Sequence, residues 1–203
     1  MKTIILITSL TLLISSGLYA GDYILSIDDQ SVEIDLNKES KFTTPAGEEL
    51  TVILKQKEYL EFKGQFFSMK HKNTLKPSTT DLGDGIFQTL MATPTGTMVL
   101  IQEYTNMNPE SLVDMMLKEL TKEEIDYGYK YKERKIERSV NGKEIHGKQA
   151  ITTHDEQEWT RAVFTYGEED QGILFVTMIE KDEYDNEQHI LSDFWKDLSL
   201  SLD

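Results

Sequence analysis

The chain has 203 residues, of which 36 are acidic and 21 basic, so its formal net charge at pH 7 is −15. A field of this sign repels nucleic acid and anionic lipid, and we therefore expect neither as a partner. The sequence contains no cysteine, which excludes disulfide bonds, thiol nucleophiles and cysteine-based metal centres.

The first 20 residues carry the pattern of a secretory signal peptide. Lys2 supplies the positive start, residues 4–14 form an apolar core, and Leu18-Tyr19-Ala20 ends in a small residue that suits cleavage before Gly21. The apolar stretch is too short to span a bilayer, and no stop-transfer segment follows it. We therefore expect a secreted or periplasmic protein that has no integral membrane segment after cleavage near Ala20.

Residues 21–60 are predicted to form a β-rich N-terminal extension, because apolar residues alternate there and turn-forming residues interrupt them twice. The first predicted hairpin spans residues 22–36 and turns at Asp28-Asp29-Gln30. The second joins residues 41–44 to residues 50–56 through Pro45-Ala46-Gly47-Glu48.

Residues 61–203 are predicted to form one main domain. Strands are expected at residues 66–69, 86–91, 98–104, 129–140, 143–152, 159–166 and 172–179, and the polar segment 76–85 is expected to be a loop. Asn141-Gly142 indicates a type I′ hairpin turn, because both residues accept positive φ angles. The strand at 172–179 is nearly all apolar, so we expect it to be covered on both faces.

Two helices are predicted in this domain. Asn108-Pro109-Glu110 is typical of a helix start, because Asn caps free amides and Pro suits the first helical position. Apolar stripes mark this helix and a second one near residues 186–199. Two striped helices beside a doubly covered strand predict an α+β fold, with a central, mostly antiparallel sheet and helices on both faces.

This order of elements, with Phe66-Phe67-Ser68-Met69 at its start and Asp193-Phe194-Trp195 near its end, resembles the PsbP-like and DcrB-like α/β/α sandwich family. The resemblance covers residues 61–203. The chain lacks the lipoprotein cysteine of DcrB-like members and adds residues 21–60. The resemblance implies an accessory, chaperone-like or partner-binding role, because the family is mostly non-enzymatic.

One segment concentrates aromatic and basic side chains. The candidate partner-binding residues are Tyr127, Tyr129, Tyr131, Lys132 and Arg134. On a strand, the tyrosines would share one face and the basic residues the other. The segment is interpreted either as a recognition surface, for a protein or a glycan, or as a charged edge strand whose charges pair with Glu133 and Glu137 and protect the edge.

No catalytic, cofactor or metal motif is found in the sequence, so we assign no catalytic, cofactor-binding or metal-binding residue and expect no cofactor. His146 and His154 are the histidines best placed to share a zinc ion, but surface or turn positions explain them as well. The acidic run at 182–187 suggests calcium, although the cap and first turn of a helix is the favoured interpretation.

We therefore expect an exported, non-enzymatic protein that binds a protein or an envelope component. A hydrolase that uses paired carboxylates from Asp81, Asp84 and Asp155 is one alternative. A periplasmic immunity or inhibitor protein, whose acidity neutralises a basic toxin, is another.

Overall fold

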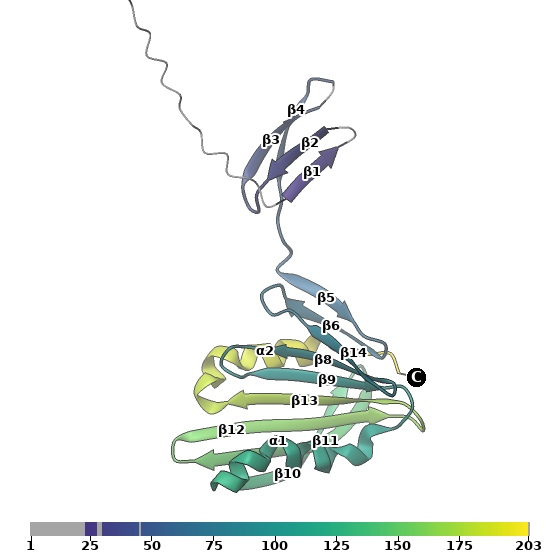
Figure 1. Ribbon diagram of the computed structural model, residues 1–203, viewed down its shortest axis with the longest axis vertical. Helices are drawn as coiled ribbons and strands as arrows, with labels where there is room; N and C mark the ends of the chain where they lie inside the picture. The colour runs from purple at the N-terminus through teal and green to yellow at the C-terminus, as the bar shows by residue number, and fades with distance from the viewer. Residues whose placement is uncertain (1–22, 28–29, 45, 203) are drawn as a thin grey trace, which may run out of the picture. The chain divides into compact units, whose positions relative to one another are not determined.

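The computed structural model describes residues 23–27, 30–44 and 46–202. The chain divides into two compact units, Met1–Gln56 and Lys57–Asp203 (Figure 1). The predicted signal peptide lies outside the described residues, so export stays a prediction. The boundary expected after residue 60 falls within strand β5 (Tyr59–Lys63), which pairs with β6 (Phe67–Lys72) in the second unit.

The described part of the N-terminal unit consists of two antiparallel hairpins. The strands are β1 (Tyr23–Ile27), β2 (Gln30–Ile34), β3 (Glu39–Thr43) and β4 (Glu49–Ile53), paired β1 with β2 and β3 with β4. A parallel bridge joins Leu36 to Leu54, and Ile34 and Phe42 are buried. Both hairpins predicted from the alternating apolar residues are therefore confirmed.

The second unit contains an antiparallel sheet of seven strands in the order β10-β11-β12-β13-β9-β8-β7. The strands are β7 (Ser78–Gly83), β8 (Ile86–Ala92), β9 (Met98–Tyr104), β10 (Lys130–Val140), β11 (Lys143–His154), β12 (Gln157–Gly167) and β13 (Gly172–Glu180). The apolar strand β13 lies fourth, and its residues 172–177 are all buried, as its sequence predicts. Asn141 and Gly142 form the predicted turn with φ angles of 52° and 77°.

A second, three-stranded sheet has the order β14-β6-β5, with β14 at Ser199–Leu200. The helices are η1 (Pro109–Leu112), α1 (Val113–Tyr127), η2 (Lys181–Glu183) and α2 (Tyr184–Asp197), where η1 and η2 are 3-10 turns. Asn108 caps η1 as predicted, because its side-chain oxygen accepts the backbone N–H of Glu110 at 3.0 Å. Among the described residues, no helix combines the length and the hydropathy that crossing a membrane requires.

The helices contact different parts of the second unit. Helix α1 packs mainly on β11 and β12, and α2 mainly on β6 and β13 (Figure 1). Leu117 of α1 shares a buried cluster with Val163 and Val176. Phe194 of α2 shares another with Phe164 and Phe175. Because successive residues of a strand point to opposite faces, these two clusters are separated by the sheet.

The predicted fold class, an α+β fold with helices on both faces of a central sheet as an α/β/α sandwich, is wrong, because a single helix on each side does not make a helical layer. The described residues are mostly β, with about 55% in strands and 20% in helices. A sandwich needs helical layers, whereas each α-helix here packs mainly on one or two strands of a seven-stranded sheet. The sequence analysis missed β5, β7 and β14. All six residues of β7 are exposed, and the sequence STTDLG resembles a loop.

Candidate functional site

The structure places the five predicted binding residues at a free edge of the large sheet. Helix α1 ends at Tyr127, because Gly128 adopts the left-handed conformation with φ 111° that terminates it. Tyr127 therefore lies on a helix and not on the predicted strand. The other four residues are Tyr129, which precedes β10, and Tyr131, Lys132 and Arg134 within β10. Among the described strands, β10 pairs with β11 alone. We call the five residues the β10 surface.

The aromatic part of the β10 surface is built around His154. The ring of Tyr129 stacks on the imidazole at a centroid distance of 5.0 Å, and Tyr127 meets it edge-on at 5.4 Å. The Tyr129 hydroxyl donates to Oε1 of Gln157 at 2.5 Å. Tyr127 is nevertheless 74% exposed. The cluster therefore holds a large aromatic ring in a defined position while leaving most of it in water.

Tyr131 belongs to a hydrogen-bonded network between the sheet edge and α1. Its hydroxyl donates to Glu133 at 2.6 Å, and Lys148 contacts Glu133 at 2.7 Å and Asp114 of α1 at 2.6 Å. Burial, together with the hydrogen bond to Glu133, raises the pKa of Tyr131 to about 12. Hydrogen bonds to Asp114 and Glu133 raise the pKa of Lys148. Tyr131 is therefore a neutral hydroxyl donor at physiological pH.

The basic part of the β10 surface faces the other side of the sheet, as strand alternation requires. Arg134 lines a groove of about 610 Å³ between strands β10–β13 and α2. The Arg138 guanidinium lies 4.7 Å from the ring centre of Trp195, and burial lowers the pKa of Arg138. The apolar lining is formed by Ile136, Ala162, Phe164, Ile179, Leu191 and Trp195. The groove therefore combines an apolar floor with three cationic side chains, Arg134, Arg138 and Lys196, and one acidic side chain, Glu137.

The sequence analysis missed Arg138, Lys196 and Trp195 as groove residues. Arg138 lies four positions after Arg134 on the same strand, so alternation alone places both on one face. Nothing local indicates that Lys196 and Trp195 of α2 meet β10, because this contact depends on the tertiary fold.

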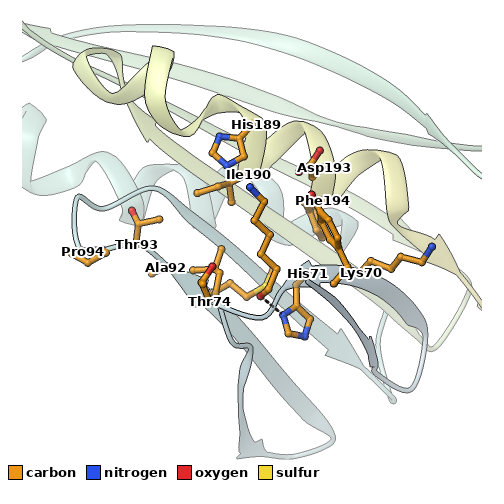
Figure 2. Close-up of a pocket in the computed structure, with 14 residues that line it drawn as sticks. Lys70, His71, Thr74, Ala92, Thr93, Pro94, His189, Ile190, Asp193 and Phe194 are labelled. Carbon is orange, nitrogen blue, oxygen red and sulfur yellow. Dashed lines mark hydrogen bonds between the residues drawn. The ribbon is translucent and has the colours of Figure 1, made fainter. Parts of the chain in front are cut away.

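A smaller cavity of about 290 Å³ lies among β6, the end of β8, the turn that follows β8, and α2. Figure 2 shows Ile190 projecting from α2 on the side of Ala92, and Phe194 projecting on the side of His71. Apolar atoms form most of its surface, although half of its 14 lining residues carry polar or charged side chains. None of its residues belongs to the predicted β10 surface.

The two histidines considered for zinc do not share a site. His146 and His154 are eight positions apart on β11, which corresponds to roughly 26 Å along a strand. Each has its own acidic neighbour, Glu137 at 3.7 Å from His146 and Asp155 at 3.5 Å from His154. Within the described ranges, no group of three histidine or acidic side chains is arranged to hold a metal ion.

The carboxylates considered for hydrolysis lie in separate hairpins. Asp81 and Asp84 belong to the β7–β8 hairpin and Asp155 to the turn between β11 and β12, with β13 and β9 between the two hairpins. At about 4.8 Å per strand step, the hairpins are roughly 14 Å or more apart, beyond the separation of a paired-carboxylate site. Asp84 and Asp155 both have φ 51° and serve tight turns.

The acidic run at residues 182–187 forms η2 and the first turn of α2. Glu187 accepts hydrogen bonds from the hydroxyls of Thr93 at 3.0 Å and Thr95 at 2.7 Å, which attaches the β8–β9 turn to α2. Burial alone would raise the pKa of Glu187, but the threonine hydroxyls of this turn outweigh that effect and lower it. The run therefore lies at a helix start with acidic residues in the first turn, as expected, but the N-cap residues Glu180 and Glu183 make no side-chain capping hydrogen bond.

The structure is similar to known ones at low sequence identity. No protein-family model and no curated protein sequence matches the chain. The solution structure of cyanobacterial PsbP (CyanoP) from Synechocystis sp. PCC 6803 has a TM-score of 0.46 at 7% identity, covering 70% of this chain and 92% of that protein. A Bacteroides thetaiotaomicron crystal structure has a TM-score of 0.38 at 11% identity, covering 83% of this chain and 50% of that one. The first of these structures is a PsbP protein, and PsbP-like proteins are the family that the sequence resembles.

Proposed function

We propose that this chain is an exported accessory protein that binds a partner protein through the β10 surface. Export depends on the predicted signal peptide at residues 1–20. The observation that carries the binding role is the ring of Tyr127, which is 74% exposed although Tyr129 and His154 hold it in place. Fixed tyrosine rings supply large contact areas at a low cost in conformational entropy, which is why they are enriched in binding surfaces.

The charge of this region indicates which kind of partner it fits. Strand β10 carries five basic and two acidic residues in its sequence KYKERKIERSV, whereas the whole chain has a net charge of −15. Complementary charges steer two proteins together and disfavour wrong partners. The contacting segment of the partner is therefore acidic. A basic toxin, which the inhibitor alternative requires, would meet the cationic part of this chain unfavourably at this surface.

Edge protection explains the charges of β10 but not its aromatic residues. Lysines and arginines on an edge strand prevent unspecific pairing with other strands. This protection requires no solvent-exposed aromatic ring. The cluster of Tyr127, Tyr129 and His154 therefore favours recognition, while the neighbouring charges serve both roles.

The test is a variant that carries Tyr129→Ala, Tyr131→Ala and Arg134→Ala together. We expect it to unfold cooperatively, because these side chains lie outside the buried clusters. The purified variant and the wild type are compared in crosslinking pull-downs from the envelope fraction of the source cells. The variant should lose the protein that the wild type captures, and the captured protein should expose an acidic segment.

A matched control carries Thr80→Ala and Leu82→Ala on β7, the opposite edge strand, where Leu82 is 50% exposed. This control should capture the same protein as the wild type. If the β10 variant captures it equally well, the proposed surface is wrong. Equal loss in both variants would also contradict the proposal, because binding would then not depend on the β10 surface.

A further inference from the structure

We propose that the cavity of Figure 2 binds a small amphipathic carboxylate, with its apolar body inside and its charged group at the mouth. The inference is independent of the β10 surface, because the two share no residue. The cavity has a volume of about 290 Å³. A dry apolar cavity of about 150 Å³ accommodates benzene, so this one has room for an apolar body of about ten carbon atoms.

The interior of the cavity suits an apolar body. Its walls include Leu75, Met91, Ile190 and Phe194, and the exposed fractions of Met91 and Phe194 are 3% and 2%. Both belong to the buried cluster that also contains Phe175, so a packed core supports this wall. Sites for small ligands are typically apolar hollows with a few polar groups that fix orientation.

The wall opposite the core is held in place before any ligand arrives. The turn that contributes Thr93 is attached to α2 through Glu187, which accepts hydrogen bonds from Thr93 and Thr95. The Thr93 hydroxyl oxygen also accepts the backbone N–H of Thr97 at 3.1 Å. A wall fixed in this way reduces the ordering cost of binding.

The charged lining favours an anionic group. Lys70, His71, Lys72 and His189 line the cavity, and Asp193 is the one carboxylate in its lining. Basic side chains therefore outnumber acidic ones here even without Lys70, in a chain whose net charge is −15. The two lysines differ in direction. Figure 2 shows the Lys70 side chain running past Phe194 and away from Thr93, so we assign the anionic group to Lys72.

The neighbouring His71 adds a structural constraint. It is buried, and its Nδ1 lies 2.9 Å from the carbonyl oxygen of Lys72. A carbonyl only accepts hydrogen bonds, so Nδ1 carries the proton in this contact. The imidazole thereby fixes the backbone of Lys72 at the cavity wall.

The experiment is calorimetric titration of the purified protein with decanoate, and with decanol as the uncharged analogue. We expect saturable binding of decanoate to the wild type. Ala92→Trp places an indole at the cavity mouth, where Ala92 is exposed, and should weaken both ligands at least tenfold. Lys72→Gln should weaken decanoate about tenfold and leave decanol unchanged.

Lys70→Gln is the matched control for the charge and should bind both ligands as the wild type does. Near-UV circular dichroism checks that each variant keeps its packed core. Failure of the wild type to bind decanoate, or equal binding by Ala92→Trp, would overturn the site. Equal binding of decanoate by Lys72→Gln would overturn its anionic end. The β10 variant should bind decanoate normally, so the two proposals fail separately.

Discussion

The two helices of the second unit are held to the sheet by different chemistry. Helix α1 is fixed by a buried ion pair, in which Arg161 contacts Glu124 at 2.6 Å and the Arg161 side chain is only 7% exposed. Thr152 donates to the same carboxylate at 2.6 Å. Leu117 adds apolar packing beside this pair. The contact of α1 therefore combines aliphatic packing with a small number of oriented polar groups.

Helix α2 is instead fixed by aromatic packing. The ring centroids of Phe194 and Trp195 are 4.8 Å apart, and Trp195 lies 5.0 Å from Phe164 and 5.6 Å from Phe175. The groove and the cavity both contain residues of α2. The candidate regions therefore depend on different anchors. The groove and the cavity depend on α2, whereas the Tyr127 ring depends on α1.

The aromatic anchor gives the largest expected effect. Phe194→Ala leaves a cavity where a side chain only 2% exposed had packed, and we expect it to lower the free energy of unfolding by about 4 kcal/mol. Urea denaturation followed by fluorescence measures the change. Phe194→Leu keeps most of the volume and should cost about 1 kcal/mol. A loss below about 1 kcal/mol for the alanine variant would contradict the role of this packing.

The ion pair between Arg161 and Glu124 gives the next largest expected effect on stability. Arg161→Met leaves Glu124 partly buried without its cation, which we expect to cost about 3 kcal/mol. Adding Glu124→Leu removes the stranded charge, and the double variant should recover most of that loss. Denaturation of the wild type, both single variants and the double variant gives the coupling energy. A double variant no more stable than Arg161→Met would mean that the pair is not what holds α1.

The features that the sequence predicts well depend on residues close together in the chain. Strand β13 and the β10–β11 turn are two of them. An apolar run indicates a covered strand, and Asn141-Gly142 indicates a positive-φ turn, so both predictions are confirmed. The alternation of tyrosines and basic residues also correctly separates Tyr131 from Arg134 across the sheet.

The features that the sequence does not predict depend on distant partners. Strand β7 exists because it pairs with β8, although its own residues are polar and exposed. The predicted fold class was wrong because the two helices carry clear apolar stripes, whereas polar strands such as β7 carry no apolar pattern and were not counted in the sheet. The cavity wall depends on Thr93 meeting Glu187, 94 positions later. No local pattern indicates that contact.

The smallest expected effect concerns Glu103, a carboxylate on the α2 side of the sheet. Its partners are backbone N–H groups, whereas Glu124 of α1 is paired with the guanidinium of Arg161. Glu103 is 3% exposed and accepts the backbone N–H of Phe66 at 2.5 Å. Burial raises the pKa of Glu103 above its ordinary value of 4.5, although hydrogen bonds from Phe66 and Gln65 partly oppose this. The folded chain therefore holds the Glu103 proton more tightly than the unfolded chain does.

This sign fixes the pH dependence that Glu103 contributes. Its stabilising contribution is fully present below pH 4.5 and is lost as the pH rises through the folded pKa, with a slope of at most about 1.4 kcal/mol per pH unit. Glu103→Gln cannot ionise and should lack this slope, while its amide oxygen still accepts the Phe66 N–H. Urea denaturation across the acidic range measures the slopes. The exposed Glu61→Gln serves as the control and should behave as the wild type. If Glu103→Gln retains the wild-type slope, burial of this carboxylate does not couple folding to proton binding. The stability of the α2 side would then be as insensitive to pH as purely aromatic packing predicts.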